Sequence, residues 1–171
     1  MGKLQGIRAH SNGASMEAMI DAGCVWYDYK GIASIHKVPE PMRVIQNLGK
    51  GKFVSVFREK ALPDYEGTMR GGRSILFEAK HSDGDEISRG RVTKKQWEKL
   101  DSASELGALC YVLISFGFRV FSMIPWALWK DMKNQVGRLH LKPTDEIVQV
   151  HRVSTSGMAI MFLDNFARYI E

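Results

Sequence analysis

The sequence predicts a single-domain α/β protein in which helices flank a mixed central β-sheet, and three observations predict this organisation. Stretches with apolar residues at helical spacing alternate with short β-rich runs along the chain. One run, Leu109–Phe116, is continuously apolar, as expected of a central strand that is covered on both faces. The length of 171 residues suits one core, so we expect a single domain over residues 1–171.

The composition is typical of a folded protein in solution, with 44% hydrophobic and 25% charged residues. No segment has the roughly 18 consecutive apolar residues of a membrane span. The N-terminus also lacks a signal-peptide core, so we expect a cytoplasmic protein with no membrane partner. Cys24 and Cys110 have apolar neighbours and no histidine at ligand spacing, which favours buried free thiols over a zinc site.

Positive charge is concentrated in three segments. The net charge is +5, and Lys and Arg gather in residues 43–60, 70–73 and 89–99. Such clusters are typical of a surface that binds a polyanion. An ordinary basic surface on a soluble protein explains the charge equally well.

The first helix is expected to begin after Ser11, Asn12 and Gly13, which supply capping chemistry. Apolar residues then recur at roughly helical spacing, and Gly31 is expected to end the helix. Glu17 would lie in the opening turn, where the helix dipole favours a carboxylate. This benefit is a purely structural explanation for Glu17.

A β-hairpin is expected over about residues 42–60. A strand over residues 32–37 comes first, and Pro39-Glu40-Pro41 then forces a change of direction. Two β-rich runs follow, separated by Gly49-Lys50-Gly51-Lys52. Because both runs mix apolar and polar residues, the hairpin could project as an arm with a basic tip. An ordinary hairpin at a sheet edge fits equally well.

The middle of the chain predicts a loop, a strand and a second helix. The loop covers residues 61–72 and leads into a strand over residues 73–80. Thr93 is the expected N-cap of the helix. One side of that helix would carry Gln96, Leu100 and Ala103.

The last third of the chain follows the apolar central strand. Residues 118–124 predict a further strand, and Pro125 is expected to open a helix. Residues 138–156 show no clear periodicity. Apolar residues at helical spacing over residues 158–170 predict a packed C-terminal helix.

The stretch from Leu62 to Lys80 carries candidate chemistry. In a strand, Glu78 and Lys80 point to one face and Ala79 to the other. Asp64 stands before a Gly-rich turn, with enough chain between to bring it beside Glu78. Mg²⁺ needs few protein ligands, so Asp64, Glu78 and the Ala79 carbonyl form a candidate magnesium site. Glu-x-Lys also occurs by chance on many solvated surface strands, so the spacing alone leaves an ordinary salt-bridged face open. Lys80 would orient or help deprotonate an attacking water, or stabilise charge on a phosphoryl group.

Several spaced blocks resemble a known family. They are Gly31-Ile32, Ile35-His36-Lys37-Val38-Pro39 with Pro41, Asp64-Tyr65 with Gly67, Phe77-Glu78-Ala79-Lys80, Gln96 and the apolar strand at Tyr111–Ser115. Together they resemble the RecU-type Holliday junction resolvases of Gram-positive bacteria and their phages. The resemblance covers about residues 13–133. Pro63 before Asp64 matches the literal Pro-Asp pair of the PD-(D/E)xK nucleases.

The resemblance implies a restriction-endonuclease-like fold with the hairpin as a projecting stalk. It also implies a homodimer that depends on Mg²⁺ or Mn²⁺ and nicks four-way junction DNA symmetrically. The implied catalytic residues are Asp64, Glu78, Lys80, Gln96 and Glu17, of which Asp64, Glu78 and Glu17 would bind metal. DNA contacts are expected from the basic residues Lys37, Arg43, Lys50, Lys52, Arg58, Arg70 and Arg73.

Two other functions stay open. A restriction-type or repair nuclease that cuts ordinary duplex would use the same fold and residues. A non-catalytic protein that stabilises recombination intermediates would use the basic hairpin alone, although the intact Asp, Glu and Lys set argues against it.

A homodimer suits the two-fold symmetry of a four-way junction. Trp97, Trp126 and Trp129 are candidates for its interface, although core packing is expected for most of them.

Overall fold

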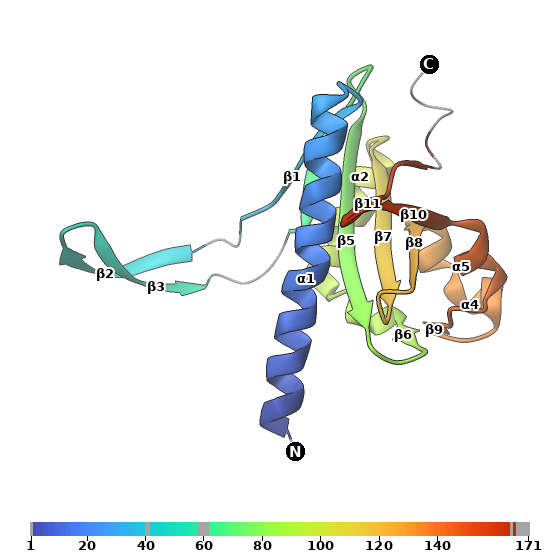
Figure 1. The fold of residues 1–171 in the computed structure, drawn as a ribbon, viewed down its shortest axis with the longest axis horizontal. Coiled ribbons are helices and arrows are strands. Elements are labelled where there is room, and N and C mark those ends of the chain that lie inside the picture. Colours follow the sequence, from blue (N-terminus) through green and yellow to red (C-terminus); the bar gives the residue numbers. More distant parts are fainter. Residues whose placement is uncertain (1, 40–41, 58–61, 165, 167–171) are drawn as a thin grey trace.

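The computed structural model describes residues 2–39, 42–57, 62–164 and 166, with side chains from residue 12 onward except that of residue 57. A seven-stranded mixed sheet runs through the body, with strand order β1-β4-β5-β7-β8-β10-β11 (Figure 1). Helices lie on both faces of this sheet. The predicted class, a mixed central sheet flanked by helices, is confirmed.

The elements follow one another along the chain in this order. Those of the first half are α1 (Gly2–Tyr29), β1 (Ala33–Lys37), β2 (Met42–Gly49), β3 (Lys52–Phe57), β4 (Tyr65–Met69), β5 (Ser74–Ser82), β6 (Ile87–Ser88) and a 3₁₀ turn η1 (Arg89–Arg91). Those of the second half are α2 (Lys94–Glu105), β7 (Leu109–Phe116), β8 (Val120–Pro125), α3 (Trp126–Lys130), α4 (Met132–Val136), β9 (His140–Leu141), α5 (Glu146–Val150), β10 (Arg152–Ser156) and β11 (Ala159–Met161).

Strand β7 lies at the centre of the sheet, as its apolar sequence predicts. It runs parallel to β5, and antiparallel to β8 on its other side. All of its residues except Tyr111 are buried. A parallel pair needs a crossover connection between its strands, and α2 provides it here.

Helix α1 begins at Gly2, so the predicted start after Gly13 is wrong. Asn12 lies inside the helix and does not cap it. Its Nδ2 donates to both carboxylate oxygens of Asp83, at 2.8 and 2.9 Å. The helix ends at Tyr29, and Gly31 follows with a φ of +62°. The glycine stop is therefore confirmed. Glu17 lies in the middle of the helix, so its helix-dipole explanation is wrong.

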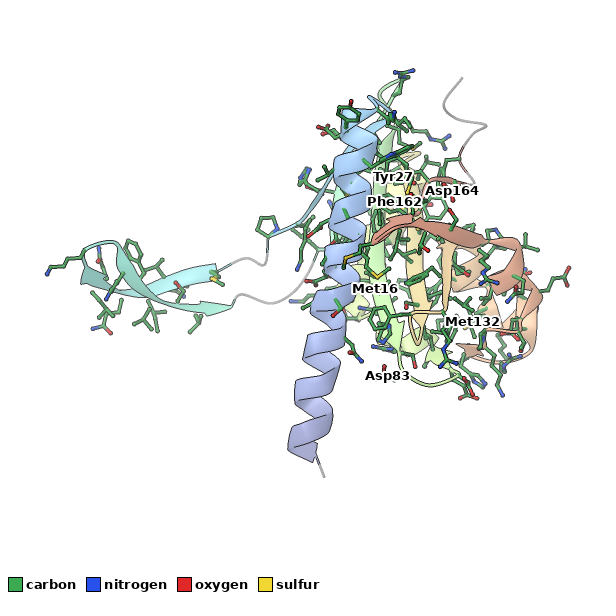
Figure 2. All side chains as sticks on the ribbon, in the orientation of Figure 1. Met16, Tyr27, Asp83, Met132, Phe162 and Asp164 are labelled. Atoms are coloured by element: carbon green, nitrogen blue, oxygen red, sulfur yellow. The ribbon has the colours of Figure 1, made fainter. Side chains whose placement is uncertain are left out.

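Strands β2 and β3 form a separate two-stranded sheet that projects from the body (Figures 1 and 2). Every residue from 42 to 56 is exposed. The turn uses three consecutive residues with positive φ, namely Gly49, Lys50 and Gly51. The predicted projecting hairpin is confirmed over the described residues, and its expected end at residues 58–60 lies outside them.

The loop expected over residues 61–72 contains strand β4, so that part of the prediction is wrong. Gly67 lies inside the strand, where a Cβ atom would come within 2.2 Å of the Ser34 carbonyl oxygen on β1. The glycine therefore permits close approach of two strands, and the turn is confined to residues 70–73, where Gly71 and Gly72 have positive φ.

The C-terminal helix expected over residues 158–170 is also wrong within the described residues. Ala159–Met161 form β11, which pairs with β10. The four consecutive residues 160–163 are all buried, whereas a helix on a surface buries one stripe. The helix expected from Pro125 is present but divides into α3 and α4 at Asp131. Residues 165 and 167–170 lie outside the described residues.

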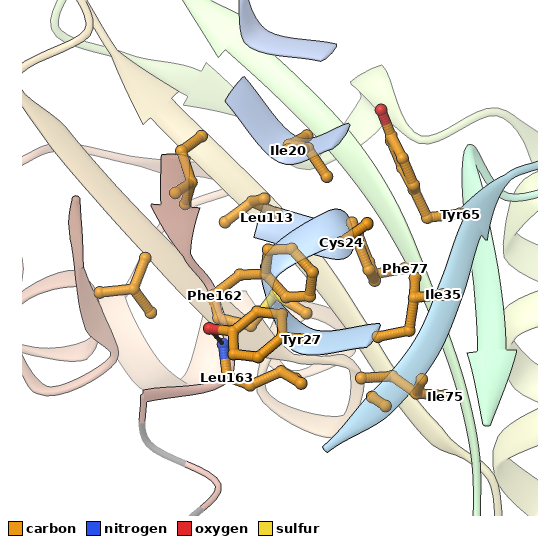
Figure 3. Close-up of a cluster of buried hydrophobic side chains, with 14 of the residues drawn as sticks. Ile20, Cys24, Tyr27, Ile35, Tyr65, Ile75, Phe77, Leu113, Phe162 and Leu163 are labelled. Atoms are coloured by element: carbon orange, nitrogen blue, oxygen red, sulfur yellow. Dashed lines mark hydrogen bonds between the residues drawn. The ribbon is translucent and has the colours of Figure 1, made fainter. Parts of the chain in front are cut away.

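Two apolar cores cover the two faces of the sheet. The first lies under α1 and includes Tyr27, Phe77 and Phe162 (Figure 3). There the Leu163 N–H donates to the Tyr27 hydroxyl at 2.9 Å. The second lies under α2 and α3. No helix in the described part of the chain, the long α1 included, could cross a membrane.

The second core contains two of the three tryptophans proposed for a dimer interface. Trp126 and Trp129 are almost fully buried, so an interface role for them is wrong. Trp97 is partly buried and packs on the same core. Cys24 and Cys110 are buried free cysteines, as predicted. Burial raises the pKa of the Cys24 thiol to about 12 and that of Cys110 to about 11.

Candidate active site

The hairpin of β4 and β5 brings two carboxylates together. Asp64 immediately precedes β4, and Tyr65 pairs with Phe77 on β5. The Asp64 N–H donates to Glu78 Oε2 at 3.3 Å, and the Ala79 N–H donates to Asp64 Oδ2 at 2.9 Å. Each carboxylate therefore accepts a backbone hydrogen bond from the other segment. This reciprocal pair fixes Asp64 beside Glu78, as the spacing predicts.

Strand alternation gives β5 one apolar face and one charged face. Phe77 and Ala79 pack in the core under α1, whereas Glu78 and Lys80 point to the face covered by α2. Lys80 Nζ contacts Glu78 Oε1 directly. The Glu78 side chain is fully buried, and that of Lys80 is 16% exposed. The predicted shared face of Glu78 and Lys80 is confirmed.

Gln96 brings α2 into the same cluster. It is the third residue of α2, and its Nε2 donates to Glu78 Oε1 at 2.5 Å. Its Oε1 accepts hydrogen bonds from the Thr93 N–H and hydroxyl, both at 3.0 Å. The sequence marks Thr93 only as a helix cap, and its link to the carboxylate cluster was missed. The Thr-x-x-Gln spacing of a capping box is the signal that could have found it.

The environment of Glu78 favours its protonated form. Burial is the largest cause and the nearby Asp64 carboxylate is the next, and together they raise the pKa of Glu78 to about 8 although Lys80 opposes them. Without a cation, this raised pKa favours a proton on Glu78. A bound cation between the carboxylates would remove the repulsion that keeps the proton there.

Glu17 lies on α1, which covers the face of the sheet opposite to α2. Its Oε2 pairs with Lys37 Nζ at 2.5 Å. Nearby, the Tyr65 hydroxyl donates to Asp21 Oδ1 at 2.9 Å and to the Glu17 carbonyl at 3.3 Å. In the described part of the chain, no three His, Cys, Asp or Glu side chains are arranged to hold a metal ion. The structure therefore does not gather Glu17 with Asp64 and Glu78.

The basic residues expected to contact DNA lie in three places. Arg43, Lys50 and Lys52 are exposed on the hairpin. Arg70 and Arg73 flank the β4–β5 turn, where Arg70 Nε donates to the Gly31 carbonyl and Arg73 Nε to the Gly107 carbonyl. Lys37 lies at the end of β1, where it pairs with Glu17. Arg58 lies outside the described residues.

Fold and site together define a class: an α/β protein with two carboxylates, a lysine and a glutamine clustered on one face of a mixed sheet. Over residues 11–164 the chain matches the family described as Recombination protein U, RecU, and it belongs to that family. The resemblance carried by the spaced sequence blocks is confirmed.

Curated relatives carry the name Holliday junction resolvase RecU. The protein of Streptococcus sanguinis (strain SK36) is 30% identical over 112 residues, which cover 62% of this chain and 56% of the relative. That of Bacillus pumilus (strain SAFR-032) is 29% identical over 120 residues, or 66% and 58% of the two chains. The matches thus span little more than half the length of these relatives.

A solved structure of Hjc, a Holliday junction resolvase from Archaeoglobus fulgidus, also aligns with this chain. The TM-score is 0.46 at 13% sequence identity, with 81% of this chain and 91% of that chain covered.

Proposed function

We propose that this chain is a metal-dependent endonuclease that resolves Holliday junctions by paired symmetric nicks in recombination and repair. The observation that carries the proposal is the buried Glu78, held against Asp64 and Lys80 on one face of β5. Burying a carboxylate with a second carboxylate beside it costs stability, and a cation site is a function that justifies this cost. The names of the relatives supply the proposed substrate.

The donor set fits Mg²⁺ or Mn²⁺ better than a structural transition metal. Hard oxygen donors from Asp64, Glu78 and the Ala79 carbonyl suit Mg²⁺, which keeps several waters and needs few protein ligands. Glu17 is the third proposed carboxylate ligand. Its pairing with Lys37 would have to be exchanged before it could join Asp64 and Glu78.

In the proposed reaction, water attacks a DNA phosphodiester in line with the leaving oxygen. When bound, the cation supplies charge stabilisation on the non-bridging and leaving oxygens. Lys80 lies at the partly open edge of the cluster, where its ammonium can orient the water or stabilise the charge on phosphorus. Gln96 and the Asp64 N–H hold the Glu78 carboxylate in place, and the Ala79 N–H holds that of Asp64.

The proposed four-way junction substrate and the proposed homodimer belong together. Two identical active sites related by a two-fold axis match the two opposing strands of a junction. The projecting hairpin, exposed along its length and basic at its tip, is a suitable element to reach toward the centre of a branched substrate. It distinguishes this proposal from that of a nuclease for ordinary duplex.

A plasmid that extrudes a cruciform tests cleavage and pairing together. Paired nicks linearise the plasmid, whereas a single nick only relaxes it and removes the cruciform. Asp64→Asn and Glu78→Gln should lower the linearisation rate in Mg²⁺ by at least about a hundredfold, because each removes a proposed metal ligand. Junction binding in metal-free buffer should be unchanged. Glu146→Gln, at an exposed position on α5, is the matched control and should cut normally.

Three experimental outcomes would contradict the proposal. Full cleavage by either variant excludes the proposed site. Equal cutting of linear duplex and junction at matched salt favours a duplex nuclease. Tight junction binding with no cleavage in Mg²⁺ or Mn²⁺ favours the non-catalytic junction-binding protein.

A further inference from the structure

Thr93 and Gln96 form a closed set of hydrogen bonds that ends on Glu78. The Gln96 N–H donates to Thr93 Oγ1 at 3.4 Å, which caps α2. The Thr93 hydroxyl in turn donates to Gln96 Oε1 at 3.0 Å, and so does the Thr93 N–H. The other end of the same carboxamide, Nε2, donates to Glu78 Oε1 at 2.5 Å. The Thr93 hydroxyl thus accepts from the backbone N–H of Gln96 and donates to the side chain of the same residue.

This arrangement determines which end of the Gln96 amide faces Glu78. A carboxamide has an accepting oxygen and a donating nitrogen, and rotation by a half turn exchanges them. After such a rotation the NH₂ group would face the Thr93 N–H, and the amide oxygen would face Glu78 Oε1. The Thr93 hydroxyl could turn to accept from the NH₂ group, but the other two contacts would be repulsive. Gln96 has an exposed fraction of only 5%, so water offers little compensation.

We propose that Thr93 is a positioning residue for the carboxylate cluster, acting through Gln96 to hold Glu78 in the orientation that accepts a metal. The inference rests on the proposed function for its metal-binding consequence. The amide orientation itself does not depend on that function. Positioning partners of ligating carboxylates typically affect metal affinity by about tenfold to a hundredfold.

The two roles of the Thr93 hydroxyl can be separated by substitution. Capping α2 needs only an acceptor, which Ser, Asp and Asn supply as well as Thr does. Holding Gln96 Oε1 needs a donor, which Ser retains and Asp lacks. Thr93→Asp should therefore preserve the helix while it pulls the Gln96 NH₂ toward the new carboxylate. Thr93→Ser should preserve both roles.

Ser88→Asp is the matched control. Ser88 caps the 3₁₀ turn η1 on the same segment by accepting from the Gly90 N–H at 3.3 Å. Its substitution adds the same negative charge without altering the hydrogen bonds that Gln96 makes with Thr93 and Glu78. Any effect common to Thr93→Asp and Ser88→Asp is then an effect of charge.

The first measurement uses metal-free protein and is independent of any nuclease activity. The Gln96 side-chain NH₂ signals in an NMR spectrum are assigned by their loss in Gln96→Leu. In the wild type, Thr93→Ser and Ser88→Asp, these signals should be shifted downfield and protected from solvent exchange. In Thr93→Asp they should move to a different position.

The second measurement is the Mn²⁺ affinity by titration calorimetry. Thr93→Asp should bind Mn²⁺ about tenfold more weakly, whereas Thr93→Ser and Ser88→Asp should match the wild type. Because Thr93 acts through Gln96, adding Thr93→Asp to Gln96→Leu should produce no further loss of affinity.

The outcomes separate this inference from the proposed function. Unprotected wild-type Gln96 signals, or signals and Mn²⁺ affinity unchanged in Thr93→Asp, overturn the role of Thr93 even if junctions are cut. A full further loss of affinity in the double variant also overturns it, because Thr93 would then act independently of Gln96. If the wild type neither binds Mn²⁺ nor cuts junctions, the proposed function fails, and the effect of Thr93 on metal binding fails with it. A moved Gln96 signal would still support the positioning of Glu78.

Discussion

At the scale of single residues, Glu78 is surrounded by groups that act in opposite directions on its charge. The donors Gln96 and Lys80 stabilise a carboxylate, whereas burial and Asp64 penalise it. The net effect is a pKa raised to about 8. A group in this state loses its proton readily when a cation arrives, so metal binding and proton release should be coupled.

The raised pKa of Glu78 predicts an unusual pH dependence of stability in metal-free protein. An unfolded glutamate has a pKa of about 4.3. Below that pH the carboxyl is protonated in both states and its contribution to stability is fully present. Between there and about pH 8 only the unfolded state loses the proton, so the free energy of unfolding should fall as the pH rises. Above about 8 this contribution is lost.

Glu78→Gln should remove that dependence, because glutamine does not titrate in this range. The measurement is urea unfolding with a chelator at several pH values from about 5 to 8, where the difference should be on the order of a few kcal/mol. The exposed-site variant Glu146→Gln should keep the wild-type slope. Parallel slopes for Glu78→Gln and the wild type would show that Glu78 has an ordinary pKa.

At the scale of elements, α1 shows how packing determines what a glycine does. Gly13 and Gly23 lie in the same helix, where glycine is intrinsically unfavourable. A Cβ atom on Gly13 would meet nothing within 4 Å. A Cβ atom on Gly23 would lie 2.4 Å from the Ile160 carbonyl oxygen on β11. Gly23 therefore permits β11 to approach the helix, whereas Gly13 has no such role.

The two glycines should respond oppositely to the same substitution. Gly13→Ala should raise the free energy of unfolding by about 0.5–1 kcal/mol, because alanine loses less entropy in a helix. Gly23→Ala should lower it by about 1–3 kcal/mol, because β11 must move away from α1. Thermal or urea unfolding of both variants measures the difference, and each is the control for the other. A stabilised Gly23→Ala variant would contradict the packing of β11 on α1.

At the scale of the whole molecule, the hairpin and the body are differently built. The body buries two cores around one sheet, whereas the hairpin exposes every residue from 42 to 56. An isolated two-stranded hairpin is marginally stable in water. Its exposed apolar side chains include Val44, Ile45 and Phe53. Together with its basic tip, these features suit a bound polyanion with apolar surfaces such as DNA bases.

Reversing the charge of the hairpin tip should weaken junction binding. The double variant Lys50→Glu and Lys52→Glu should lower affinity and make its salt dependence shallower, by about 0.9 in log–log slope for each DNA phosphate that the tip no longer neutralises. Fluorescence anisotropy of a labelled junction at several salt concentrations measures both. Lys133→Glu, on α4 across the body from the hairpin, measures the effect of half that change in net charge at a distant position. An unchanged affinity and slope would exclude the tip from the DNA interface.

Local patterns in the sequence were enough to predict much of the fold and of the candidate site. Continuous apolarity identifies β7, a two-residue period places Glu78 and Lys80 on one face, and Thr93 marks the start of α2. The sequence also predicts that Asp64 reaches Glu78, because the Gly-rich turn leaves enough chain between them to bring the two carboxylates together. These features depend on backbone geometry over a few residues, which side-chain type and spacing report directly.

Only the tertiary structure decided the features that depend on contacts distant in sequence. Asn12 continues α1 while its side chain binds Asp83, β4 needs the bare backbone of Gly67 against β1, and the apolar C-terminal segment pairs as β11. It also paired Glu17 with Lys37 and buried Trp126 in the core. In each case a distant partner supplies the burial or the hydrogen bond that overrides local preference, and no spacing within the segment encodes that partner.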